Sequence, residues 1–245
     1  MVTAADSGDP LPVESSVWLT ARPAAPARRR SEAPSGLDRD RITAATVRLL
    51  DSEGLARFSM RRLAGGLGVT AMSLYWYVDT KHDLLELALD RALGELALSA
   101  GPAPEAPAPD AGPAPDAGPA PDGAPPPHAG PPPAPAPGPE GWSGRLRVLA
   151  RAYRRLLADH PWVAPLTAAY PNIGPHARAF DAALQRLLDA TGLADPARTG
   201  AHLAVSQFLH GCGGAARRAP EGDFCLALDV LIAGIEAKAG AAATA

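Results

Sequence analysis

The sequence predicts an all-α fold with two helical units, and three observations support this prediction. Apolar residues recur at helical spacing over residues 38–98 and again over 142–238, as they do along one face of a helix. No stretch of useful length alternates apolar and polar residues as a half-buried strand does. A block over residues 100–140, built largely of Pro, Ala and Gly, separates the two helical units.

This block contains a short repeat. The six-residue unit Pro107–Gly112 recurs at 113–118, and a degenerate copy begins at Pro119. The unit carries no large apolar side chain, so nothing offsets the cost of ordering the backbone, about 1–2 kcal/mol per residue. We expect a disordered, polyproline-like linker over 100–140 between units at 37–99 and 141–240.

Composition limits the classes of function. The 245-residue chain has a net charge of −3, so a nucleic-acid site must be a local basic patch. Two cysteines are too few for a disulfide framework and lack metal-ligand spacing. No apolar run is long enough to span a membrane, and the N-terminus lacks the apolar region of a secretory signal. We therefore expect a cytoplasmic protein without a membrane partner.

Residues 1–36 form a separate N-terminal region. Residues 17–31 are rich in arginine and poor in acids, a composition also found in transit peptides. The favoured interpretation is a disordered basic arm over 1–36.

The first unit is predicted to contain three short helices and one longer helix over about 80–98. The expected N-caps are Asp38, Ser59 and Thr70, and the glycines expected to end the first two helices are Gly54 and Gly68. The long helix has Leu84, Leu85, Ala88, Ala92, Leu93 and Leu96 on its apolar side. We expect it to pack directly on the second unit, with the linker looping out.

Residues 59–77 have the pattern of a helix-turn-helix, two short helices joined at Gly68-Val69. On the second helix, Leu74 and Val78 share one side, whereas Met72 and Trp76 fall on the opposite side with Tyr75 beside them. An exposed apolar cluster on so short a helix is typical of a binding surface. The alternative is a solvated helical surface over an aromatic core.

The same region is locally basic. Residues 28–62 contain nine arginines and five acids, and Lys81 follows. A positive field around a protruding helix suits the neutralisation of DNA phosphates.

These residues carry a family resemblance. The stretches 59–69, 73–78 and 81–85 closely resemble the DNA-binding region of TetR-family repressors, and Leu74-Tyr-Trp-Tyr-Val78 is similar to the tetracycline-repressor branch. The second unit is similar to the C-terminal domain of that branch at, among others, His160-Pro-Trp162 and Gly174-Pro-His-Ala177. The resemblance implies an N-terminal three-helix helix-turn-helix domain, a connecting helix and a C-terminal helical domain that dimerises and binds an inducer.

The resemblance also implies DNA-contacting residues. The full set of candidates is Ser59, Arg61, Thr70, Ala71, Met72, Ser73, Tyr75, Trp76, Tyr77 and Lys81. Arg61 is the base-reading candidate because a guanidinium can bond guanine O6 and N7 together. Met72 and Tyr75 match base-facing positions, whereas Ser73, Tyr77 and Lys81 match phosphate contacts. Ala71 stands where the prototype has a long amide that reads a base, so we expect a different operator.

The second unit is predicted to hold about five helices, at about 142–158, from 161, at 175–190, 196–217 and 223–238. The candidate dimer interface is Val205, Leu209, Cys212, Leu228, Ile232 and Ile235. The fourth helix has a second stripe, Leu203, Gln207, His210 and Gly214, so we expect it to lie between neighbours on two sides.

The candidate effector-pocket residues are Trp162, Tyr170, His176, Phe180, His202 and Phe208. Ordinary core packing also explains each of them. No histidine has a partner at metal-ligand spacing, so we expect no catalytic metal and no cofactor. A tetracycline–magnesium site is an open alternative that rests on the resemblance alone.

The predicted function is a repressor that binds a palindromic operator on double-stranded DNA as a homodimer and is released by a small molecule. One alternative is an effector-independent activator or architectural DNA-binding protein. Another is a helical carrier or an enzyme. The sequence favours neither a carrier nor an enzyme, because it offers no nucleophile–base pair, phosphate loop or paired carboxylates on one helical face.

Overall fold

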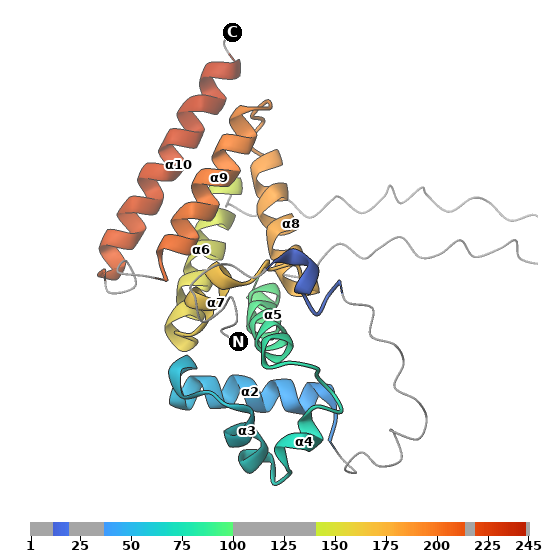
Figure 1. The fold of residues 1–245 in the computed structure, drawn as a ribbon. Coiled ribbons are helices and arrows are strands. Elements are labelled where there is room, and N and C mark those ends of the chain that lie inside the picture. The colour runs from blue at the N-terminus through green and yellow to red at the C-terminus, as the bar shows by residue number, and fades with distance from the viewer. Residues whose placement is uncertain (1–11, 20–36, 100–140, 214–218, 244–245) are drawn as a thin grey trace, which may run out of the picture.

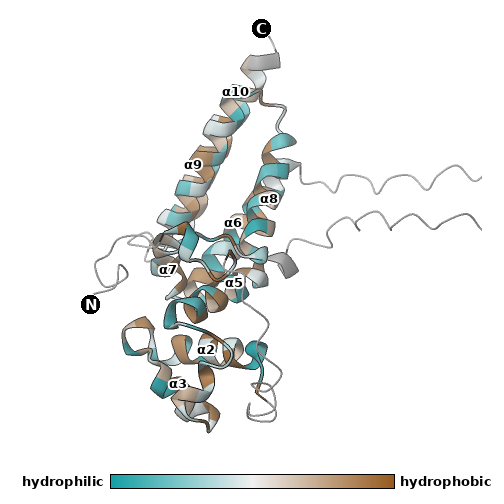
Figure 2. Ribbon diagram, turned by 45° about the vertical axis from the view of Figure 1, so that its right-hand side comes forward, coloured by the Kyte–Doolittle hydropathy of each residue, from teal (hydrophilic) through white to brown (hydrophobic). Residues whose placement is uncertain are grey.

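A computed structural model describes residues 12–19, 37–99, 141–213 and 219–243 (Figure 1). Within these residues the chain is helical and contains no strand, which confirms the all-α prediction. The linker 100–140 and most of the predicted arm 1–36 lie outside the described residues. The helices carry both hydrophilic and hydrophobic residues (Figure 2), and no described helix could span a bilayer.

The first three helices of the N-terminal unit lie below the rest of the molecule in Figure 1. They are α2 (Arg39–Glu53), α3 (Met60–Leu67) and α4 (Ala71–Leu74), with a 3₁₀ turn η3 (Leu55–Arg57) between the first two. The predicted N-caps are confirmed, because the side chains of Asp38, Ser59 and Thr70 each accept a hydrogen bond from a backbone N–H in the following turn.

The connecting helix α5 (Lys81–Ser99) begins with a reciprocal cap. Thr80 Oγ1 accepts from the N–H of Asp83 at 3.0 Å, and Asp83 Oδ2 accepts from the N–H of Thr80 at 3.2 Å. Its residues from Leu84 to Asp90 are all buried, because α5 packs against α2 on one side and the C-terminal helices on the others. The prediction that this helix packs directly on the second unit is confirmed.

The C-terminal unit has the five predicted helices. They are α6 (Trp142–Asp159), α7 (Val163–Ala169), α8 (Pro175–Asp189), α9 (Ala197–Gly211) and α10 (Glu221–Ala243). Helix α9 ends earlier than predicted, and α10 runs five residues beyond the predicted end at Lys238. Helices α6, α7 and α8 contact α5, whereas α9 lies between α8 and α10 (Figure 1).

A short N-terminal segment, residues 12–19, packs against this body. It contains a 3₁₀ turn, η2 (Val13–Ser15), and its residues Val17 and Trp18 pack on the core. The prediction of a disordered arm over 1–36 did not anticipate this segment. Its order comes from hydrogen bonds to Glu86 of α5, a partner about seventy positions away in the sequence.

Candidate DNA-binding surface and effector site

The turn between α3 and α4 has a left-handed residue, as predicted. Gly68 adopts φ 69° and ψ 26°, a conformation that glycine reaches without steric cost. The N–H of Val69 then bonds to the carbonyl of Ala64 at 3.0 Å, which closes a Schellman-type helix end. This turn holds α4 beside α3 at the end of the molecule farthest from α10 (Figure 1).

Helix α4 is shorter than the sequence pattern predicts. Its α-helical part covers only Ala71–Leu74, and the chain continues as a turn through Tyr75–Tyr77. The N–H groups of Tyr77 and Val78 both bond to the carbonyl of Leu74, at 2.9 and 3.2 Å. Leu74 and Val78 are buried, as predicted, so they anchor this turn to the core.

Two large side chains of α4 and its turn face solvent. Met72 is 72% exposed and Tyr75 is 43% exposed, in agreement with their predicted outward positions. Trp76, which was also expected to be exposed, is half-buried, and Tyr77 packs partly against the core. Because residues 75–77 form a turn, the 100° projection of an ideal helix does not apply to them.

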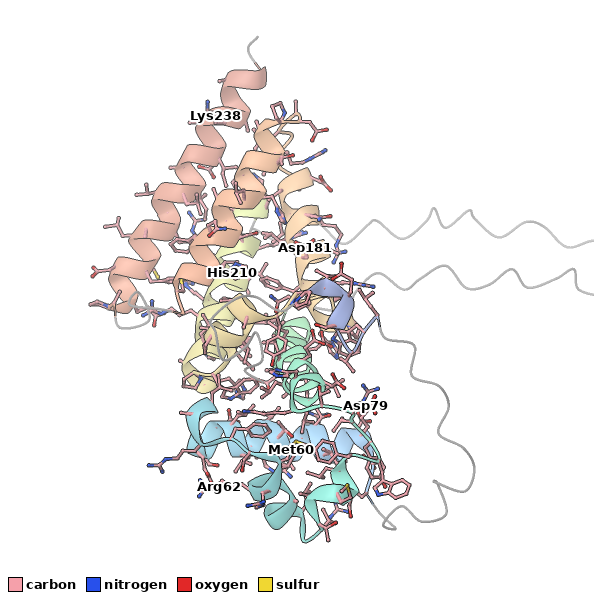
Figure 3. The ribbon with its side chains drawn as sticks, viewed as in Figure 1. Met60, Arg62, Asp79, Asp181, His210 and Lys238 are labelled. Atoms are coloured by element: carbon pink, nitrogen blue, oxygen red, sulfur yellow. The ribbon has the colours of Figure 1, made fainter. Side chains whose placement is uncertain are left out.

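The basic residues nearby differ in their availability. Arg61, in the first turn of α3, is exposed. Its neighbour Arg62 pairs with Glu53 of α2 at 2.7 Å, and Lys81 Nζ lies 5.8 Å from the centre of the Phe58 ring. Figure 3 shows Arg62 at the end of the molecule opposite Lys238. Arg61 is therefore better placed than Arg62 to read a base.

The hydroxyl candidates cap helices. Ser59 Oγ accepts from the N–H of Arg62, and Thr70 Oγ1 accepts from the N–H of Ser73, each at 3.3 Å. Thr70 and Ser73 also hydrogen-bond to each other through their hydroxyls at 2.9 Å. These bonds fix the first turns of both short helices. Half-buried Ala71 lies in the first turn of α4, as expected, and its methyl group cannot donate to a base.

The six candidate effector-pocket residues are not brought together. Trp162 donates its indole N–H to Asp51 of α2 at 2.6 Å, so it joins the two units. Phe180 stacks on Tyr153, and Phe208 stacks on Phe224, with ring centres 5.3 and 5.4 Å apart.

The two histidines of that set lie at the surface. His202 Nε2 lies 3.0 Å from Asp181 Oδ1, and His176 is an exposed residue in the first turn of α8. Only Tyr170 of the six candidates lines the pocket described next.

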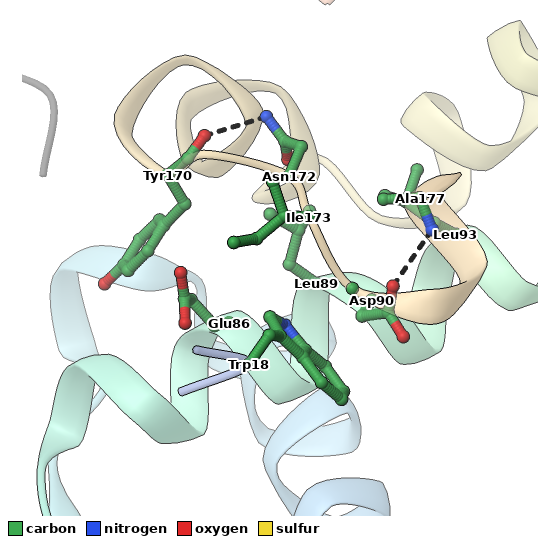
Figure 4. A pocket seen from close by; sticks show the side chains of 10 residues that line it. Trp18, Glu86, Leu89, Asp90, Leu93, Tyr170, Asn172, Ile173 and Ala177 are labelled. Carbon is green, nitrogen blue, oxygen red and sulfur yellow. Dashed lines mark hydrogen bonds between the residues drawn. The ribbon is translucent and has the colours of Figure 1, made fainter. Parts of the chain in front are cut away.

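This pocket lies between α5, the α7–α8 connection and the N-terminal segment (Figure 4), and it has room for about one water molecule. Its lining residues are Trp18, Glu86, Leu89, Asp90, Leu93, Tyr170, Asn172, Ile173, Gly174 and Ala177. Among the described residues, no three His, Cys, Asp or Glu side chains gather as a metal site.

Two carboxylates of α5 face the pocket. Asp90, 4% exposed, accepts hydrogen bonds from the N–H groups of His176 and Ala177, each at 3.0 Å, and so caps α8. Glu86, 6% exposed, accepts from the hydroxyl of Ser16 at 3.0 Å and the N–H of Val17 at 2.8 Å. Burial raises the pKa of both carboxyl groups, against the opposing effect of these hydrogen bonds.

Sequence reasoning missed both acids. The available signal was their spacing: Glu86 and Asp90 stand four apart within a helix whose other residues are mostly apolar. Charged residues at such positions are buried only when they have partners. Neither partner was visible from the local sequence, since one lies in residues 12–19 and the other in α8.

The six candidate dimer residues are buried inside one chain. Val205, Leu209, Cys212, Leu228, Ile232 and Ile235 are each no more than 5% exposed, because the helices of this chain cover them. A partner subunit could not reach them. The large apolar residues left exposed on the same two helices are Leu203 of α9 and Leu226 and Val230 of α10. Leu203 belongs to the second stripe of α9.

Both units match family models. Residues 42–88 match the model described as bacterial regulatory proteins, tetR family, and residues 134–222 match the tetracyclin repressor-like C-terminal domain. These matches cover the helix-turn-helix with part of α5, and most of the C-terminal helices.

Curated relatives have similar descriptions. An HTH-type transcriptional regulator of Saccharopolyspora erythraea is 32% identical over 175 residues, which are 71% of this chain and 59% of the relative. The HTH-type transcriptional repressor DrrR1 of Streptomyces coeruleorubidus is 32% identical over 185 residues, 75% of this chain and 56% of that protein. The chain thus spans less than two thirds of either relative.

Solved structures share the fold. ActR of Streptomyces coelicolor, in complex with actinorhodin, has a TM-score of 0.60 at 23% identity, and the match covers 85% of this chain and 99% of the ActR chain. BioQ with its double-stranded DNA operator has a TM-score of 0.58 at 23% identity, and the match covers 82% of this chain and 99% of the BioQ chain.

The protein thus has a helix-turn-helix unit and a C-terminal helical unit, and helix α5 packs against both. This arrangement is that of a two-domain bacterial regulator. The chain belongs to the TetR family of transcriptional regulators.

Proposed function

We propose that this protein is a transcriptional repressor that binds a palindromic DNA operator as a homodimer and is released by a small molecule. In this proposal residues 37–99 form the DNA-binding unit, residues 141–240 form the dimerisation and effector unit, and the linker 100–140 loops out. The protein acts in the cytoplasm, as a regulator and not as an enzyme. DrrR1, a relative, is named as a repressor.

The observation that carries the proposal is the position of α5. Its buried residues pack against α2 of the N-terminal unit and also against α6, α7 and α8 of the C-terminal unit. A ligand that shifts α5 within the C-terminal unit therefore moves α3 and α4 with it. Such coupling between two sites typically amounts to about 1–3 kcal/mol.

Dimerisation is supported by the surface of α10. Leu226, Val230, Ala233 and Ala237 are all exposed and fall on one narrow face of the helix. An isologous contact through this face gives two reading heads related by a two-fold axis, which requires a palindromic operator. Exposed Leu203 and Gln207 of α9 extend the candidate interface.

Two structural neighbours support the proposal that a ligand releases this protein from DNA. The structure of ActR holds actinorhodin, and the structure of BioQ holds its double-stranded DNA operator. The same fold thus accommodates both kinds of partner in those proteins. The pocket beside α5 is the candidate effector site here.

The test begins with selection of bound fragments from random DNA by the purified full chain. We expect a palindromic site with two half-sites. Fluorescence anisotropy on that site then compares the wild type with Arg61→Ala, which should lose about 1–3 kcal/mol of binding free energy. Arg178→Ala, an exposed arginine of α8, is the matched control and should bind as the wild type does.

Two results would contradict the proposal. Absence of any selected DNA at low salt would contradict DNA binding itself. Unchanged operator affinity across a broad panel of ligands would contradict release and favour an effector-independent regulator. A reporter gene downstream of the site distinguishes repression from activation.

A further inference from the structure

Residues 12–19 close one side of the pocket beside α5. Trp18 is part of the pocket lining, and Val17 and Trp18 pack against the core, whereas Val13 and Leu19 stay about half exposed. Figure 4 shows Trp18 next to Glu86 and Asp90, with Tyr170 and Asn172 across the pocket. With the segment in place, the remaining space holds about one water molecule, too little for an organic ligand.

The segment interacts with the pocket as a bound ligand does. Ser16, which is 2% exposed, donates its hydroxyl to Glu86 Oε2, and the N–H of Val17 donates to the same oxygen. The segment therefore supplies two hydrogen-bond donors and an aromatic ring. If it left, the carboxylate of Glu86 would lose the donors that compensate its burial.

The lining holds one more carboxylate and one acceptor that lacks a donor within the described part of the chain. Asp90 is a second carboxylate, already bonded to α8. Asn172 Oδ1 is a buried acceptor that has no hydrogen-bond partner among the described residues. The hydroxyl of Tyr170 lies 2.9 Å from Nδ1 of His82. A ligand in this pocket thus meets acceptors and negative charge, which exclude an anion and favour a protonated amine.

We infer that residues 12–19 are a tethered occupant of the effector site, which the effector displaces by placing a protonated amine against Glu86 and an aromatic ring where Trp18 now lies. The inference rests on the proposed function only in calling the ligand an effector, since its binding can be measured without DNA. Glu86 belongs to α5, so the segment and the ligand act on the helix that both units share.

A tethered occupant lowers the apparent affinity for a ligand in proportion to the fraction of chains in which the site is free. Substitutions that weaken the contacts of residues 12–19 with the pocket should therefore strengthen ligand binding. If the segment were only part of the pocket wall, the same substitutions should weaken ligand binding. The direction of the change in affinity therefore tests the inference.

The experiment uses tryptamine, an indole with an ammonium group, as the probe and isothermal titration calorimetry as the measurement. The full chain is compared with the double variant Ser16→Ala/Trp18→Ala, which keeps the chain length. We expect the double variant to bind tryptamine about tenfold more tightly, as when the free site is populated at about 10% in the wild type. Val13→Ala, on the exposed side of the same segment, should bind as the wild type does.

Charge recognition is tested in the same background. Adding Glu86→Gln to the double variant should remove the gain, and indole-3-acetate, the anionic counterpart of the probe, should not bind. In the wild type, tryptamine should speed hydrogen exchange at the peptide containing Val17. Circular dichroism melts establish that each variant is folded, and single Ser16→Ala and Trp18→Ala variants replace the double variant if it is not.

Several outcomes would overturn the inference: equal or weaker tryptamine binding by the segment variants, equal binding of the anion, or no tryptamine binding by any variant. These outcomes are separate from the failure of the proposed function. If the segment variants bind tryptamine more tightly but no variant binds DNA, the tethered occupant stands and the repressor proposal falls. If the protein binds DNA but the segment variants bind tryptamine no more tightly than the wild type, the repressor proposal stands and the tethered occupant falls.

Discussion

The indole N–H of Trp162 donates to the carboxylate of Asp51 at 2.6 Å and so ties the C-terminal unit to the last turns of α2. The same carboxylate oxygen lies 2.7 Å from Nδ1 of His160, whose Nε2 lies 3.2 Å from Glu95 of α5. This contact is a second connection between the units besides α5. It joins the C-terminal unit to the DNA-binding unit at the end of α2, not at helix α4, which carries Met72.

Removing this connection should destabilise the protein. Asp51→Ala leaves the buried indole N–H of Trp162 without its acceptor, and such an unsatisfied donor costs about 1–3 kcal/mol. We expect a fall of that size in the free energy of unfolding, measured by urea denaturation. Asp159→Asn, an exposed acid in the last turn of α6, is the control and should stay within about 0.5 kcal/mol of the wild type. A loss equal to that of the control would show that the Asp51 contact adds nothing.

The same cluster should give the stability a pH dependence. Burial lowers the pKa of His160, but the hydrogen bonds and charges of Asp51 and Glu95 outweigh it and raise the pKa overall. A group whose pKa is higher in the folded state contributes its full stabilisation of the fold below its unfolded pKa, which is about 6.5 for histidine. This contribution is lost as the pH rises through the pKa of the folded state. We therefore expect this group to make the free energy of unfolding fall as the pH rises above about 6.5.

Comparison with His160→Gln isolates that contribution. Burial lowers the pKa of His210, which makes stability rise with pH, but only below its unfolded pKa of about 6.5. Urea denaturation at several pH values should therefore show a difference between wild type and His160→Gln that shrinks with rising pH. A difference that grows with pH would contradict the ion pair.

A single glycine should be required where α8 approaches α5. A Cβ added at Gly174 would overlap the carboxylate of Asp90, which caps α8 through the N–H groups of His176 and Ala177. We expect Gly174→Ala to reduce the melting temperature, with a loss of about 1–3 kcal/mol as in other overpacked sites. Gly200→Ala is the matched control: it lies inside α9, has nothing within 4 Å of the added Cβ, and should stabilise by up to about 1 kcal/mol.

The exposed face of α10 should govern the oligomeric state. Leu226→Glu/Val230→Glu places two charges on the proposed interface, and we expect a monomer by light scattering together with weaker operator binding. Val148→Glu, at an exposed apolar residue of α6, should leave the dimer intact. A dimer that tolerates both charges on α10 would move the interface elsewhere.

Sequence patterns were sufficient for features that depend on neighbours along the chain. The caps at Asp38, Ser59 and Thr70, the left-handed Gly68 and the buried pair Leu74 and Val78 all depend on residues within a few positions. Each was predicted correctly. The length of α4 was not, because a helix this short has few bonds of its own and follows the packing of its ends.

The particular partners of side chains that contact distant segments could not be predicted. A buried aromatic residue such as Trp162 fits a ligand pocket, a core or a contact between units equally well in the sequence. Its partner Asp51 lies more than a hundred positions away. Likewise Val205 and Leu228 are apolar residues on amphipathic helices, and only the packing of α9 and α10 shows that this chain covers them itself.

The helices on either side of the predicted linker, α5 and α6, contact each other directly. If the linker is flexible, as the sequence predicts, closing it costs only about 0.6 kcal/mol more for each doubling of its length. Gain or loss of six-residue units by slippage of the replicating gene would therefore change the length of the polypeptide while the arrangement of its helices stayed the same. Natural variants that differ in repeat number should be interchangeable in the cell.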